Sequence, residues 1–103
     1  MADDALSDEL FGFLVATFGD SDFTGLADAE VARRAAAPAL VPWHRALVAE
    51  GRALLAGPAF PDRAVAQAAN RHFESPEAAQ AWFAAMLDAL AEGADRAALD
   101  GGA

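Results

Sequence analysis

The feature that most constrains the fold is a run of apolar side chains with helical spacing in the C-terminal third of the chain. The run consists of Ala79, Trp82, Phe83, Met86, Leu87 and Leu90, at positions i, i+3, i+4, i+7, i+8 and i+11. This spacing places all of these side chains on one face of an α-helix. Ser75 and Pro76 suit the N-cap and the first position of that helix, and Gly93 suits its end. The sequence therefore predicts an amphipathic helix that ends at Gly93.

Shorter stretches with the same spacing predict four more helices. Ser7 is the expected N-cap of the first, and Asp28 is the expected cap of the second. The third helix carries Trp43, which we expect in the core together with Trp82 because both follow helical spacing. The expected ranges are 7–18, 28–36, 42–56 and 61–73.

These elements predict an all-α fold, with one small domain of about five helices in an antiparallel or orthogonal array. No segment alternates with period two, and β-branched residues are scarce, which disfavours a sheet. A chain of 103 residues has room for one core. We expect the helical domain to cover residues 7–93. A disordered N-terminus (1–6) and a frayed helix or disordered tail (94–103) would flank it.

The charge is strongly unbalanced, with 16 acidic residues against seven basic ones, all arginine, and a net charge of −9. Such a field repels nucleic acid and anionic membranes and attracts cationic proteins. No apolar run approaches the roughly 18 residues that span a bilayer, and the N-terminus has no secretory signal. We therefore expect a cytoplasmic protein whose partner is neither nucleic acid nor membrane.

Residues that could carry catalysis are few. The chain has no cysteine, which excludes disulfides, thiolate zinc sites and a cysteine nucleophile. His44 and His72 have no third ligand at metal-binding spacing, and no glycine-rich phosphate loop follows a strand. The interpretation is a protein that is not an enzyme and that uses no cofactor and no metal.

The acidic stretch after the first helix leaves one metal alternative open. Asp20, Asp22, Thr24, Gly25 and Asp28 fall at positions 1, 3, 5, 6 and 9 of an EF-hand calcium loop. Position 12, where a bidentate glutamate closes the ion cage, is Val31. A degenerate EF-hand-like calcium-binding module is thus the first alternative function. The second is an acidic helical adaptor or regulator that acts as a homodimer.

Read in order, nearly the whole chain resembles a known family. An aromatic-rich opening helix covers residues 10–18, and a short segment with acids and an aromatic follows. A Leu-rich helix (46–56) and a closing helix (75–90) with the pair Trp82-Phe83 complete the pattern. The order is similar to that of immunity proteins from bacterial contact-dependent growth inhibition systems. The chain departs from the family at 18–23, which reads Phe-Gly-Asp-Ser-Asp-Phe and lacks the family's His and Trp.

This resemblance implies that the protein binds and neutralises a cognate toxin domain inside the producing cell. Toxins of this kind are often nucleases with a basic cleft, which an acidic protein can block by electrostatic complementarity. We expect a monomer or a weak homodimer. Carboxylates of the interface would pair with Lys or Arg of the toxin, and Phe23 would be an apolar anchor. The predicted partner-binding residues are Asp20, Asp22, Phe23, Asp28 and Glu30.

Overall fold

The computed structural model describes residues 6–18, 27–58 and 60–102, and in this part of the chain every regular element is a helix. The α-helices are α1 (Asp8–Phe18), α2 (Asp28–Ala35), α3 (Val41–Ala56), α4 (Asp62–Ala69) and α5 (Pro76–Gly102), and a short 3-10 helix, η3 (Pro38–Leu40), leads into α3. The predicted fold class, one small all-α domain of about five helices, is confirmed for the described residues.

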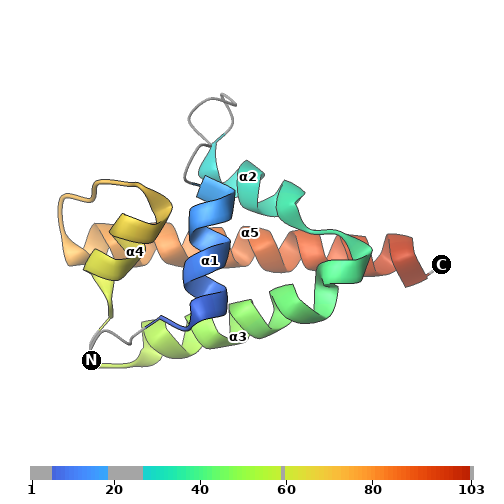
Figure 1. Cartoon of the computed structure of the whole chain (residues 1–103), viewed down its shortest axis with the longest axis horizontal. Coiled ribbons are helices and arrows are strands. Elements are labelled where there is room, and N and C mark those ends of the chain that lie inside the picture. Colours follow the sequence, from blue (N-terminus) through green and yellow to red (C-terminus); the bar gives the residue numbers. More distant parts are fainter. Residues whose placement is uncertain (1–5, 19–26, 59, 103) are drawn as a thin grey trace.

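The long helix α5 forms the spine of the molecule (Figure 1). α2 and α3 both pack along α5, and α3 runs antiparallel to it. α1 lies at a steep angle to α5 (Figure 1). It packs mainly against α4, which lies beside the first half of α5. The array thus combines the antiparallel and orthogonal arrangements that the short connections predicted. Although α5 has 27 residues, neither it nor another described helix combines the length and apolar character needed to cross a membrane.

The core lies where α1, α3 and α4 meet the apolar face of α5. The expected apolar stripe of α5 is buried at Phe83 and Leu90, and the apolar face of α1 meets it through Leu10 and Phe18. Burying each such side chain contributes roughly 1.5–3 kcal/mol of folding free energy, which makes these contacts the main source of stability. The other large buried members of the core cluster are Phe13, Leu14, Leu47, Val48, Val65, Met86 and Leu87, and Ala32, Ala68, Ala69 and Ala89 are buried with them.

Both predicted serine caps are present. The Ser7 hydroxyl oxygen accepts a hydrogen bond from the backbone N–H of Leu10 at 3.1 Å, and the Ser75 hydroxyl accepts one from Ala78 at 3.1 Å. Each bond satisfies a backbone donor that the first turn of a helix leaves unpaired. Ser7 also donates its hydroxyl hydrogen to Glu50 of α3 at 2.7 Å, so the cap joins α1 to α3.

Two expected helix boundaries differ from the structure. Ala27, not Asp28, is the N-cap of α2, and the Asp28 side chain makes no capping bond because Arg71 and Trp82 engage it instead. The fourth helix ends at Ala69 rather than continuing to residue 73. Asn70 ends it in the left-handed conformation (φ 57°, ψ 50°), which asparagine tolerates better than most residues.

The expected end of the last helix at Gly93 is also wrong, since α5 continues to Gly102. Gly93 serves helix packing instead. A Cβ atom at this position would lie 2.4 Å from the carbonyl oxygen of Arg33, at the C-terminal turn of α2. Ala94 and Ala97 beyond it are buried, and the burial of these side chains stabilises the continued helix.

Trp43 does not belong to the core as expected. Its side chain is 38% exposed at the start of α3, and its ring packs edge-on against Phe13 with the ring centroids 6.0 Å apart. The next residue on α3, His44, is buried instead and packs against Phe13 in the core, where the helical spacing predicts Trp43.

Candidate functional site

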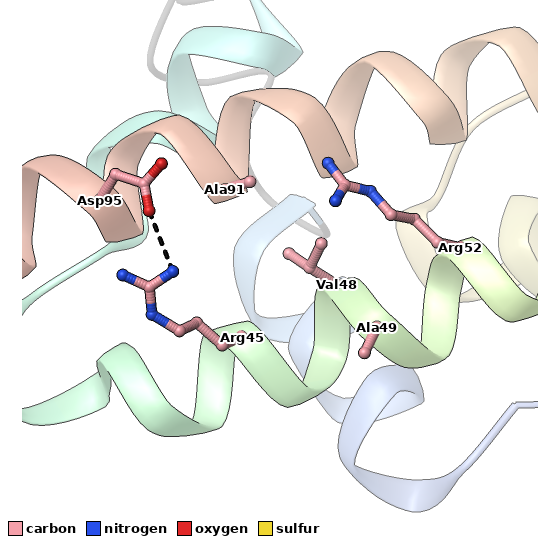
Figure 2. A pocket seen from close by; sticks show the side chains of 6 residues that line it. All are labelled: Arg45, Val48, Ala49, Arg52, Ala91 and Asp95. Carbon is pink, nitrogen blue, oxygen red and sulfur yellow. Dashed lines mark hydrogen bonds and ion pairs between the residues drawn. The ribbon is translucent and has the colours of Figure 1, made fainter.

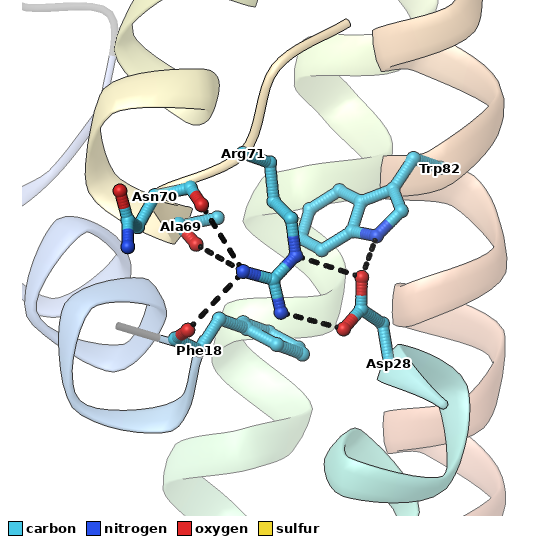
Figure 3. Close-up of polar contacts among 6 residues, drawn as sticks. All are labelled: Phe18, Asp28, Ala69, Asn70, Arg71 and Trp82. Atoms are coloured by element: carbon cyan, nitrogen blue, oxygen red, sulfur yellow. Dashed lines mark hydrogen bonds and ion pairs between the residues drawn. The ribbon is translucent and has the colours of Figure 1, made fainter. Parts of the chain in front are cut away.

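Arg71 joins three helices, α1, α2 and α4, through a single guanidinium group (Figure 3). Its Nε donates to Oδ2 of Asp28 at 3.0 Å, and its Nη2 donates to Oδ1 of the same carboxylate at 2.7 Å. Such a bidentate pair fixes both the distance and the orientation of its partners. Arg71 follows Asn70 directly, so the left-handed end of α4 determines where this side chain begins.

The third nitrogen of Arg71 bonds helix ends rather than a carboxylate. Nη1 donates to the carbonyl oxygens of Phe18 at 3.4 Å, Ala69 at 3.1 Å and Asn70 at 3.1 Å. These carbonyls lie at the C-terminal ends of α1 and α4, where the helix dipole favours a cation. Asp28 lies in the first turn of α2, where the dipole favours an anion. The ion pair therefore complements the dipoles of three helices.

Trp82 completes this cluster from α5. Its indole Nε1–H donates to Oδ2 of Asp28 at 2.6 Å, and its ring packs on Phe18 and Phe73 with centroids 5.1 and 5.5 Å apart. The hydrogen bonds from Arg71, and then that from Trp82, lower the pKa of Asp28, while partial burial acts in the opposite direction. Asp28 is therefore a firmly ionised carboxylate with both oxygens occupied. We call Asp28, Arg71 and Trp82 the Arg71 cluster.

The structure places two of the five predicted partner-binding residues, and both form ion pairs within the chain. Asp28 belongs to the Arg71 cluster. Glu30 accepts hydrogen bonds from Arg34, at 2.8 Å, and from Arg33, and these bonds lower its pKa. Asp20, Asp22 and Phe23 lie outside the described residues.

The calcium alternative gains no support from the residues that the structure describes. They contain no group of three or more His, Asp or Glu side chains that could hold a metal ion. Asp28, the ligand expected at position 9 of the loop, already accepts three hydrogen bonds, two from Arg71 and one from Trp82.

The charges are unevenly distributed over the surface. Three ion pairs cross from α2 and α3 to the exposed side of α5: Arg33–Glu92 at 2.6 Å, Arg45–Asp95 at 2.9 Å and Arg52–Asp88 at 3.4 Å. The first turns of α1, α4 and α5 are acidic and have no ion pair within the described part of the chain. These acids, with one that precedes α5, are Asp8, Glu9, Asp62, Glu74 and Glu77. We call Asp62, Glu74 and Glu77 the acidic end, because α4 and the start of α5 lie together at one end of the molecule (Figure 1). This end also holds Arg63 of α4, and the first turn of α1 lies instead against α3, where Ser7 bonds Glu50.

A shallow groove of about 340 Å³ lies between α3 and α5 (Figure 2). Val48, Ala49 and Ala91 line it with apolar surface, and Arg45 and Arg52 reach across from α3. Both arginines are about half exposed, and each pairs with a carboxylate of α5. The groove is therefore bridged by the fold's own ion pairs.

His44 is the buried polar side chain of the core, at 1% exposure. It lies between the rings of Phe13 and Trp43, with centroids 5.6 and 5.1 Å away, and its Nδ1 finds no hydrogen-bond partner among the described residues. Burial lowers the pKa of His44, so the ring is neutral at pH 7. This environment is that of an aromatic packing residue.

Sequence reasoning missed Arg71 as an organising residue. The available signal was Asn70, because asparagine is the commonest residue after glycine to end a helix in the left-handed conformation. Ending α4 there would have placed Arg71 in a turn, free of the helix that was expected to reach residue 73. Nothing in the sequence, however, paired Arg71 with Asp28, 43 positions earlier.

Comparisons of the chain with protein-family models, with curated proteins and with solved structures gave no match.

Proposed function

We propose that this protein is an immunity protein, a stoichiometric inhibitor that binds and neutralises a cationic toxin domain through its acidic surface. The observation that supports the proposal best is the separation of charge. Arg33, Arg45 and Arg52 are engaged by carboxylates of α5, so they do not neutralise the acidic end. The acidic end thus presents three carboxylates that form no ion pair in the described part of the chain, against one arginine, Arg63.

A patch of this kind suits fast, specific association with a basic protein. Complementary charge steers diffusional encounters and suppresses wrong partners, and its effect weakens with ionic strength. Acidic residues in first turns also stabilise their own helices through the dipole, so the same side chains serve folding and recognition. The similarity of the helix order to immunity proteins of contact-dependent growth inhibition systems points to a toxin domain as the basic partner.

The interface in this proposal has two parts. Asp20, Asp22 and Phe23 remain the predicted contacts on the segment between α1 and α2. The acidic end supplies the field that brings the partner in, with Glu74 and Glu77 at the start of α5. Asp28 and Glu30 act within the fold, since both are held by arginines of this chain.

The test first reads the open reading frames that flank this gene and takes the C-terminal domain of a large neighbouring one as the partner. Flanking frames with no such toxin domain would contradict the proposal. The association of this partner domain with the wild type and with two charge-reversed proteins, Asp20→Lys with Asp22→Lys and Glu74→Lys with Glu77→Lys, is measured by stopped-flow fluorescence at several salt concentrations. We expect at least one reversed pair to slow association about tenfold or more at low salt, with a smaller effect at high salt.

A matched control reverses charge away from both regions, at Asp88 and Asp95 on the exposed side of α5. This variant should associate like the wild type if position matters rather than net charge. No complex with the neighbouring domain, or equal slowing in all three variants, would contradict the proposal.

The adaptor alternative has one supporting observation, namely large apolar side chains exposed on α1 and α3. Phe11 is 39% and Val15 45% exposed, and Trp43 is similar. If this alternative is right, sedimentation equilibrium will give twice the chain mass of 10.6 kDa at micromolar concentration.

A further inference from the structure

An open pocket, called the arginine cavity below, is lined by three arginines near the end of α2. Its volume is about 400 Å³. Arg33 and Arg34 reach it from the last turn of α2, and Arg96 from the second half of α5. The remaining lining residues are Glu30, Ala36, Pro38, Gly93 and Ala97.

The packing of α2 on α5 assembles this cavity. Gly93 allows the backbone of α2 to approach closely, since a Cβ there would lie 2.4 Å from the carbonyl oxygen of Arg33. Arg96 is three residues further along α5 and therefore lies on the same side of the helix as Gly93. The close approach thus brings guanidinium groups from two helices to one cavity, in a protein whose net charge is −9.

The carboxylates nearby do not use all of this positive charge. Glu30 and Glu92 bind Arg33, and Glu30 also binds Nε of Arg34. Arg96 forms no ion pair and no hydrogen bond through its side chain with any residue that the structure describes. Two arginines with donors to spare can bind a planar or tetrahedral oxyanion in a bidentate manner.

We propose that this cavity binds an organic oxyanion, a carboxylate or phosphate group attached to a small apolar body. Arg96 and Arg34 hold the charged group, and Ala36, Pro38 and Ala97 accommodate the apolar part. A volume of about 400 Å³ falls within the usual range for small-molecule sites, about 300–1,000 Å³. This site goes beyond the proposed function, because it has the opposite charge and lies on a different part of the surface from the acidic end.

The experiment titrates the folded protein with phenyl phosphate, benzoate and inorganic phosphate, and follows backbone amides by NMR. We expect saturable shifts at Ala36, Gly93 and Ala97, and weaker binding of inorganic phosphate, which lacks the apolar body. The tighter of the two aromatic ligands identifies the preferred charged group.

Three variants locate the site. Arg96→Gln should weaken binding about tenfold, because a hydrogen-bonded charge is lost, and Arg34→Gln with Arg96→Gln should abolish it. Arg63→Gln is the matched control: Arg63 is an exposed arginine of α4 and loses the same charge elsewhere. Circular dichroism checks that each variant is folded.

Binding that persists in the double variant, or that falls equally in the Arg63 and Arg96 variants, would overturn the proposal, as would an absence of saturable shifts. Because the altered arginines lie outside the acidic end, toxin binding by these variants is a separate measurement. A negative result for oxyanion binding therefore does not bear on the proposed toxin binding, and the reverse also holds.

Discussion

Asp28 and Arg71 show how a charged pair can be partly buried between helices. Removing two charges from water costs several kcal/mol, and the cost is recovered only where geometry and further hydrogen bonds are good. Here the side chains are 27% and 14% exposed, and each polar atom of the Asp28 carboxylate has a donor. The pair depends on both members, because either alone would be left partly buried without its counter-charge.

Asp28→Asn is therefore expected to lower the free energy of unfolding by about 2 kcal/mol at pH 7, as measured by urea denaturation. The matched control is Asp88→Asn, which breaks an exposed pair with Arg52 and should cost less than about 1 kcal/mol. Equal costs would show that the Arg71 cluster contributes no more than a surface pair.

Asp28 also predicts that the free energy of unfolding depends on pH in the acidic range. Arg71 lowers the pKa of Asp28 below its ordinary value of 3.8, so the folded state binds this proton less readily than the unfolded state. The contribution is complete above pH 3.8 and is lost as the pH falls through the folded-state pKa. The difference in stability between wild type and Asp28→Asn should shrink in that window.

His44 predicts a second pH effect, near neutrality. Burial lowers its pKa below 6.5, so the unfolded state takes up the proton first and stability falls as the pH drops below 6.5. His44→Leu, which also removes the unpaired Nδ1, should flatten this loss in urea titrations between pH 5 and 7. His72→Gln, at an exposed position, should retain it. A wild-type slope that survives in His44→Leu would assign the effect to another group.

At the scale of elements, glycine residues decide where α2 and α3 pack closely on α5. α2 meets α5 at Gly93, and α3 meets it where Gly51 lies against Leu87 and Phe83. At Gly93 the obstacle to a side chain is backbone, which cannot rotate away, whereas at Gly51 it is the side chains of Leu87 and Phe83. Helix propensity alone would favour alanine at either position.

Gly93→Ala is expected to destabilise the protein by about 1–3 kcal/mol, since the added methyl group would force α2 away from α5. Gly12→Ala is the control, because its Cβ would meet nothing within 4 Å on α1. That variant should be more stable than the wild type by about 0.5–1 kcal/mol. In thermal unfolding, the midpoint temperature should fall for Gly93→Ala and rise for Gly12→Ala. A higher midpoint for Gly93→Ala would contradict close packing of α2 on α5 at Gly93.

At the scale of the whole molecule, acidic side chains without an ion pair in the described part of the chain and a group of arginines lie in different regions. Asp62 and Glu77 lie in the first turns of α4 and α5, whereas Arg34 and Arg96 lie near the end of α2. At physiological salt, exposed charges more than about 8 Å apart are largely screened from one another, so each region acts through its own local charge. The two proposals thus assign a basic protein partner to one region and an oxyanion to the other, and variants that change the charge of one region test each proposal separately.

The sequence by itself determined the all-α class, the apolar faces of the first and last helices, and the serine caps. These depend on spacing and on contacts within one turn, which the sequence contains directly. The tertiary structure alone decided that Asp28 pairs with Arg71, that Trp43 is exposed while His44 is buried, and that Gly93 continues a helix. Each of these depends on a neighbour brought close by packing, and local spacing carries no information about which distant residue that neighbour will be.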